Sequence, residues 1–78
     1  MEFASDVTEG SFLLSMTGKE RLWLENYESI LVYNDREVVI MARRTRIRIQ
    51  GDHLCIESYG SVEMKLKGNI DYIQFEGL

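Results

Sequence analysis

The chain has 78 residues, of which 45% are hydrophobic and 28% charged, and 13 acidic against 9 basic side chains leave a formal net charge of −4. A chain of this size buries only about 60% of its surface on folding, which argues against a large two-layer enzyme with a deep cleft. The composition is that of one small folded domain, and the negative charge disfavours attraction of the whole surface to nucleic acid or anionic lipid.

The first sixteen residues differ in pattern from the rest. Asp6 and Glu9 have the spacing of a capping box, but Gly10 follows where a helix should continue. We expect residues 1–16 to form a flexible or loosely packed arm, irregular or weakly helical, ahead of a single β domain over residues 17–78. Three apolar residues in this arm either cover the chain's own core or contact another subunit: Phe12, Leu13 and Leu14.

The cellular compartment is indicated by three features of the sequence. The single cysteine, Cys55, cannot form an internal disulfide. No stretch approaches the roughly 18 uninterrupted apolar residues of a membrane span, and the N-terminus is acidic where a signal peptide would be basic. We therefore expect a cytoplasmic protein that is not itself inserted in a membrane.

Apolar residues alternate along the chain from Leu22 onward, and proline is absent. Alternation with period two predicts strands with one buried face, and glycine, asparagine and aspartate then mark the turns. We predict an all-β fold, a compact antiparallel meander or roll of about six to eight short strands. Whether it closes as a small sandwich or as a barrel is left open. The alternating pairs and triplet are Leu22/Leu24, Ile30/Val32, Val38/Ile40, Ile47/Ile49, Leu54/Ile56, Val62/Met64/Leu66 and Ile73/Phe75.

A first hairpin is predicted between residues 28 and 42. Its apolar runs occupy both faces, as in central strands that are covered on each side. A three-residue loop from Asn34 to Arg36 would place Val32 opposite Val38, whereas a two-residue loop would pair Val32 with a glutamate. We therefore prefer the longer loop.

A second hairpin is predicted between residues 44 and 58, with Gly51 and Asp52 at its tip, because a Gly-first two-residue turn matches the twist of the strands. This register places Ile49 opposite Leu54, and it also places Arg46 opposite Glu57. A third hairpin, between residues 61 and 77, would have Gly68 and Asn69 at its tip and pair Met64 with Ile73.

These two segments share a pattern of residues. Ile47–Asp52 and Met64–Asn69 both read apolar, basic, apolar, polar, Gly, then Asp or Asn, at an offset of seventeen residues. Two copies are too few for a repeat protein. We interpret the likeness as recurrent hairpin chemistry.

The sequence shows little that points to catalysis or to a cofactor. His53 and Cys55 would supply only two metal ligands from one strand, and a zinc site needs more. The acidic residues are explained by solvation of loops. We expect no catalytic residue, no metal site, no cofactor and no small-molecule substrate.

One local charge is unusual, namely four arginines within six residues: Arg43, Arg44, Arg46 and Arg48. A basic stripe beside aromatic side chains is how compact β folds hold single-stranded nucleic acid. Trp23, Tyr27, Tyr33 and Tyr59 are candidates for the aromatic part of such a surface. The pairing of Arg46 with Glu57 and the acidic net charge argue against this interpretation, so polyanion binding is the alternative hypothesis.

Three segments in this order and spacing resemble the YabP/YqfC family of sporulation proteins. They run from Gly18 to Ile30, from Ile47 to Ile56 and from Leu66 to Phe75, so the likeness covers about residues 17–76. The segment Leu24-Glu25-Asn26 brings the chain closer to the YqfC branch.

The resemblance implies a small non-enzymatic protein, made in the mother cell of endospore-forming bacteria and needed for normal sporulation. Because such proteins are typically encoded beside a membrane protein, it also implies a protein partner at the membrane surrounding the forespore. The arginine-rich segment 43–48 and residues 1–10 depart from the family pattern.

Our hypothesis is an assembly, scaffold or adaptor module. A strand edge, or the aromatic surface of Trp23 and Tyr27, would pair with a second copy or with another protein by strand addition. A polyanion-binding β-barrel using Arg43, Arg44, Arg46 and Arg48, and an accessory subunit of an enzyme, are the competing hypotheses.

Overall fold

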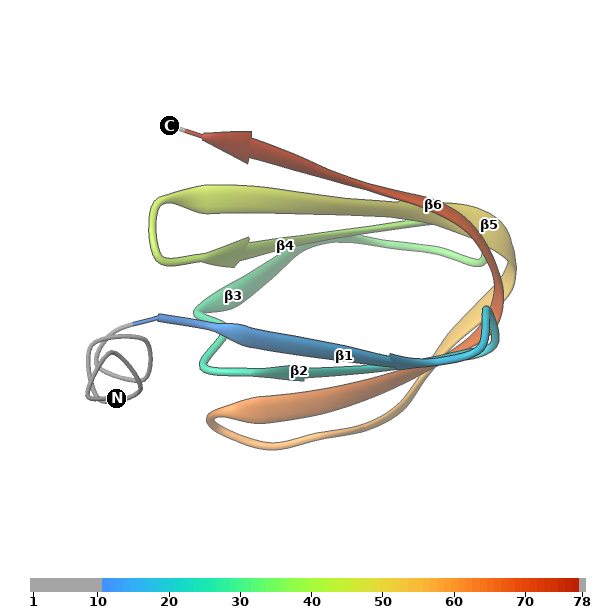
Figure 1. The fold of residues 1–78 in the computed structure, drawn as a ribbon, viewed down its shortest axis with the longest axis horizontal. Helices are drawn as coiled ribbons and strands as arrows, with labels where there is room; N and C mark the ends of the chain where they lie inside the picture. Colours follow the sequence, from blue (N-terminus) through green and yellow to red (C-terminus); the bar gives the residue numbers. More distant parts are fainter. Residues whose placement is uncertain (1–10, 78) are drawn as a thin grey trace.

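The computed structural model describes residues 11–77 and shows six antiparallel strands in one sheet (Figure 1). The order across the sheet is β1-β2-β6-β5-β4-β3. The all-β prediction is confirmed, although two of the strands are far from short. The strands are β1 (Leu13–Thr17), β2 (Arg21–Glu25), β3 (Ser29–Tyr33), β4 (Glu37–Ala42), β5 (Thr45–Tyr59) and β6 (Glu63–Gly77).

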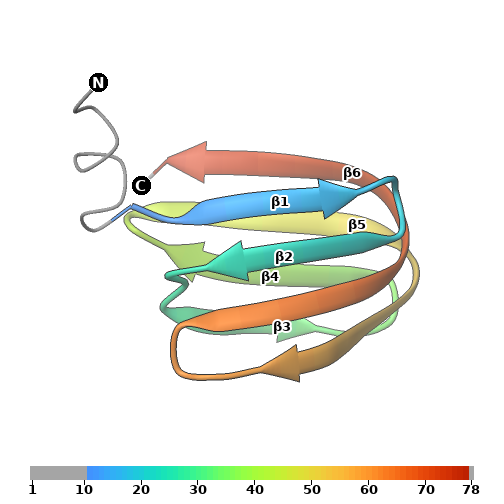
Figure 2. The ribbon, with the colours of Figure 1, turned by 60° about the horizontal axis from the view of Figure 1, so that its bottom comes forward.

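The sheet folds over on itself because β5 and β6, each 15 residues long, bend sharply together halfway along their length (Figure 1). Figure 2 shows the two layers that result. The β2 layer contains β1, β2, the first arm of β6 (residues 63–67) and the last arm of β5 (residues 54–59). The β4 layer contains β3, β4, the first arm of β5 (residues 45–50) and the last arm of β6 (residues 70–77).

The two predicted hairpin tips are in fact the bends of these long strands. Gly51 pairs with Ile70, and Asp52 pairs with Asn69, in the middle of the β5–β6 ladder. The predicted hairpins over residues 44–58 and 61–77 are therefore wrong, and so are their registers: Ile49 lies opposite Ile73, and Met64 lies opposite Leu24 and Tyr59. The actual turn between β5 and β6 lies at residues 60–62.

The glycines are required at the bends because the two backbones approach each other closely there. A Cβ atom on Gly51 would lie 1.9 Å from the carbonyl oxygen of Asn69, and one on Gly68 would lie 2.6 Å from that of His53. Gly68 also has a φ of 141°. Next to it the β5 strand carries a bulge, in which His53 adopts a left-handed φ of 56°.

The tight turns of the two outer hairpins cap the two bends in the same way. The N–H groups of Gly68 and Ile70 donate to carbonyl oxygens in the β1–β2 turn, at 3.0 and 2.9 Å. The N–H groups of Gly51 and Leu54 donate to carbonyl oxygens in the β3–β4 turn, at 3.0 and 2.9 Å. The repeated pattern in Ile47–Asp52 and Met64–Asn69 thus marks equivalent positions, a first arm followed by its bend, and does not reflect hairpin tips.

The hydrophobic core lies between the two layers. Burying one large aliphatic side chain contributes about 1.5–3 kcal/mol, so the core is the main source of stability for a chain of this size. Val62 and Phe75, predicted to face the core, are 57% and 53% exposed. The buried core residues are Leu22, Leu24, Met64 and Leu66 of the β2 layer, Val38, Ile40, Ala42, Ile47 and Ile49 of the β4 layer, and Leu54 and Ile70 beside the bends.

The β3–β4 hairpin has the three-residue loop that the sequence predicts. The side-chain oxygen of Asn34 accepts hydrogen bonds from the N–H groups of Arg36 and Glu37, both at 2.8 Å, which holds the turn. Next to the turn, Val32 lies opposite Val39 and not opposite Val38 as predicted; the bulge at Leu31 then shifts the register, so that Ile30 lies opposite Ile40, as predicted.

Side-chain contacts are made across both open sides of the folded sheet. On one side, the Tyr33 hydroxyl of β3 accepts a hydrogen bond from the N–H of Ile56 in β5, at 2.9 Å. On the other side, Phe12 stacks on Phe75 of β6 with the ring centroids 6.1 Å apart. Residues 13–16, which were expected in the arm, belong to β1 and hence to the sheet; residues 1–10 lie outside the described part of the chain.

Candidate interaction surfaces

The outer face of the β4 layer carries two of the four candidate arginines, and acidic residues pair with both. Arg48 donates to Glu37 at 2.5 Å and lies 3.5 Å from Glu76, and Arg46 also lies 3.5 Å from Glu76. Gln50 donates to the same Glu37 carboxylate at 3.3 Å. The result is a small ion-pair network across β4, β5 and β6.

This network changes the proton affinity of its two central groups. Hydrogen bonds from Arg48 and then from Gln50 lower the pKa of the Glu37 carboxyl, because they stabilise its charged form. Hydrogen bonds to Glu37 and Glu76 raise the pKa of Arg48. Because Arg46 and Arg48 both pair with carboxylates of this chain, their positive charges are largely compensated. This weakens the hypothesis that the segment binds a polyanion.

The other two arginines lie at the tip of the β4–β5 hairpin. Arg43 and Arg44 have left-handed φ values of 47° and 61°, as in a type I′ turn. The N–H of Arg43 donates to the Glu28 side chain at 3.1 Å. Glu57, the partner that the sequence suggested for Arg46, pairs instead with Arg21 at 3.3 Å. Two of the four arginines therefore lie on the outer face of the β4 layer, and the other two lie in the β4–β5 turn.

Trp23 lies on the outer face of the β2 layer, where the residue is 41% exposed. It projects outward because its neighbours Leu22 and Leu24 point into the core. The Lys65 ammonium lies 4.7 Å from the centre of the ring, within the range of a cation–π contact. A groove of about 180 Å³ runs beside this pair and is lined by Ser15, Thr17, Arg21, Leu22, Trp23, Glu57, Lys65 and Leu66.

Tyr27 does not share that surface with Trp23. Its ring packs against the core, and its hydroxyl donates to the carbonyl oxygen of Gly60 at 2.6 Å. This bond ties the β2–β3 connection to the β5–β6 turn. The position of Tyr27 indicates a structural role.

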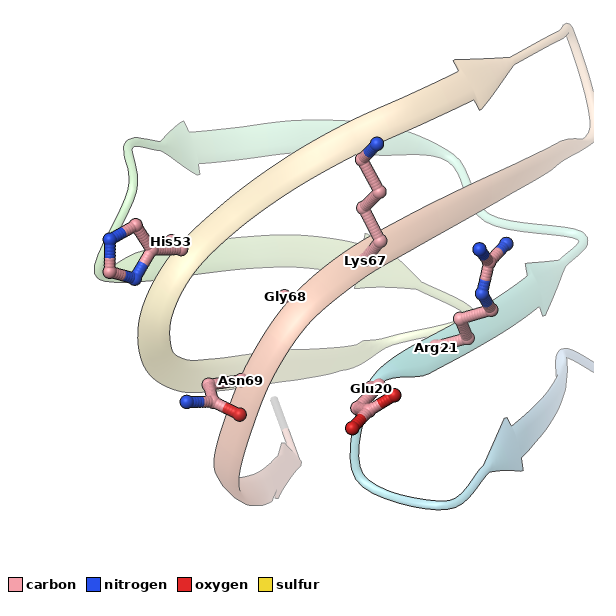
Figure 3. A pocket seen from close by; sticks show the side chains of 6 residues that line it. All are labelled: Glu20, Arg21, His53, Lys67, Gly68 and Asn69. Carbon is pink, nitrogen blue, oxygen red and sulfur yellow. The ribbon is translucent and has the colours of Figure 1, made fainter.

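An open depression of about 340 Å³ lies at the bend of β6 (Figure 3). Arg21 and Lys67 are direct partners on neighbouring strands, while His53 comes from the bulge of β5. Sequence reasoning missed this site because it treated Gly68 and Asn69 as a hairpin tip. The lining residues, shown as sticks in Figure 3, are Glu20, Arg21, His53, Lys67, Gly68 and Asn69.

His53 and Cys55, the two potential metal ligands, are both exposed. Within residues 11–77, no three His, Cys, Asp or Glu side chains are grouped so that they could hold a metal ion. The same residues contain no helix long and apolar enough to cross a membrane.

Comparison with known proteins places this fold in a family. The model of the YabP family matches residues 9–77, nearly the whole chain. The chain belongs to the YabP family. It is also 25% identical over 75 residues to the uncharacterized protein YqfC of Bacillus subtilis (strain 168), an alignment that covers 96% of this chain and 81% of that protein. The resemblance drawn from the three sequence segments is thereby confirmed, and membership of the YabP/YqfC family suggests a sporulation-related protein.

Proposed function

We propose that this protein is a non-enzymatic assembly, scaffold or adaptor module that acts in the mother cell during sporulation, with a membrane protein at the forespore-surrounding membrane as its partner. The family supports the link to sporulation. The surface of the folded sheet supports the link to assembly.

The observation that carries the proposal is the distribution of exposed apolar side chains along strand edges and on one outer face. Such side chains are the main recognition resource of a small β protein. In the part of the chain that the structure describes, the depressions near the bends are lined mainly by polar and charged side chains. The exposed large apolar residues are Leu13 and Met16 of β1, Trp23 of β2, Leu31, Val32 and Tyr33 of β3, Tyr59 of β5, Val62 in the β5–β6 turn, and Tyr72 and Phe75 of β6.

Deletion of the gene, followed by spore counts and by imaging of a fluorescent fusion, tests this proposal. We expect fewer heat-resistant spores and a signal that follows the membrane around the forespore. The signal should become diffuse when the membrane protein encoded beside the gene is removed. Normal spore counts, together with a diffuse signal in both strains, would contradict the proposal.

Variants of the gene introduced into the deletion strain distinguish this proposal from polyanion binding. A double charge reversal at the hairpin tip, Arg43→Glu with Arg44→Glu, should leave spore counts unchanged, because neither arginine takes part in the proposed contacts. The matched positions Arg46 and Arg48 are poor choices, since their replacement would break the network with Glu37 and Glu76. Loss of spores in the double variant, with salt-dependent retention of the wild-type protein on an oligonucleotide column, would favour the polyanion alternative.

A further inference from the structure

In the described residues 11–77, the folded sheet has four strand edges without a pairing partner, and three of them are protected against pairing with another chain. Natural proteins protect edges with bulges, charges, proline or covering groups. The β3 edge carries the bulge at Leu31. The last arm of β5 carries the charged Glu57 within a register shift, and its Ile56 N–H is bonded to Tyr33. The last arm of β6 carries the charged Asp71 at a register shift, followed by Glu76.

Within residues 11–77, the β1 edge has none of these protections. Its five residues, Leu-Leu-Ser-Met-Thr, contain no charge and no proline, and all five pair with β2 in an unbroken register. Leu13 and Met16 are each 40% exposed. Between residues 11 and 77, no other strand pairs with the free side of β1. This edge offers unpaired backbone groups to an incoming strand.

We infer that β1 pairs antiparallel with β1 of a second copy of this chain, a conclusion that rests on the proposed assembly function. The segment is self-complementary about Ser15. With Ser15 opposite Ser15 of the second copy, Leu14 meets Met16 of that copy, and Leu13 meets Thr17. No like charges face each other in this register.

The inward-facing side chains of β1 make this register favourable. Leu14 and Met16 lie opposite the buried residues Leu24 and Leu22 of β2, so both point toward the interior of the folded sheet. Pairing would place them against their counterparts and continue the core across the two-fold axis. An antiparallel contact of this kind is isologous, so it closes as a dimer and leaves no free β1 edge for a filament.

A lysine at the centre of the contact tests the inference. The full-length protein should sediment as a dimer. Ser15→Lys places two ammonium groups face to face across the interface and should raise the dimer dissociation constant by about tenfold or more. Ser29→Lys, at an exposed serine on the protected β3 edge, is the matched control and should leave the dimer unchanged. Thermal unfolding of both variants would check that each is folded.

A second variant tests the register itself. In a Cys55→Ser background, Ser15→Cys should form a disulfide-linked dimer on mild oxidation, because facing Cα atoms of an antiparallel pair lie about 4.5–5.5 Å apart. Ser29→Cys in the same background should not. A monomeric wild-type protein, or a dimer that resists Ser15→Lys and fails to cross-link through Ser15→Cys, would overturn the inference. A monomer that still supports sporulation at the membrane would overturn it and leave the proposed function intact.

Discussion

At the scale of single residues, the fold depends most on Gly51 and Gly68. Each lies where β5 and β6 bend together, and at each the neighbouring backbone leaves no space for a Cβ atom. Gly68 has the further constraint of a positive φ. Side chains in the core tolerate some repacking, but a backbone contact of this kind cannot move without opening the ladder between the two long strands.

We predict that Gly51→Ala and Gly68→Ala each lower the free energy of unfolding by about 2–4 kcal/mol, because the added methyl group overlaps a backbone carbonyl. Gly60→Ala is the control, since the nearest atom to a Cβ there is 4.0 Å away. It should be neutral or slightly stabilising. Urea unfolding followed by Trp23 fluorescence measures all three; equal effects at the three positions would show that the bends are not sterically constrained.

Several residues illustrate how far the sequence alone could go. The outward position of Trp23 follows from the buried Leu22 and Leu24 on either side, so it was predictable from alternation. The role of Tyr27 was not, because its partner Gly60 lies 33 residues away. The acidic partners of Arg46 and Arg48 depend on a register that only the whole sheet defines.

At the scale of elements, the sequence predicts strands well and their connections less well. A Gly-Asp pair between two alternating runs is typical of a hairpin tip, but the same residues suit a bend in a continuous strand. The choice is decided by the β5–β6 ladder, in which the first arm of each long strand pairs with the last arm of the other, so the side that a hairpin would need is already occupied. Local pattern contains no information on those distant partners. The β3–β4 loop was predictable because Asn34 bonds its own turn.

The β4–β5 turn supplies a prediction at this scale. Arg43 and Arg44 both hold left-handed φ values, which cost a residue other than glycine about 1–2 kcal/mol. Replacing Arg44 by glycine should relieve most of this cost and raise the midpoint of thermal unfolding. Arg36→Gly, in the β3–β4 turn, is the control: Arg36 does not have a positive φ, so the change should not stabilise. A lower midpoint for Arg44→Gly would contradict a type I′ turn.

At the scale of the whole molecule, two outer hairpins flank one long central hairpin and cap its two bends alike. This arrangement builds a core between two layers from one sheet, but it leaves four strand edges where a closed barrel would leave none. Three of the edges are protected, and the fourth, β1, lies next to the exposed Trp23 and Lys65. Self-pairing through β1 would leave the outer face of the β2 layer available to a different partner.

The spore count of a strain that carries Ser15→Lys in place of the wild-type gene tests the central claim most directly, because it links the β1 contact to the biology. The protein level should be normal, the protein monomeric, and the number of heat-resistant spores reduced toward that of the deletion strain, while Ser29→Lys should give wild-type numbers. Wild-type spore numbers from a strain whose Ser15→Lys protein is shown to be monomeric would contradict an account in which this protein acts by assembling with itself.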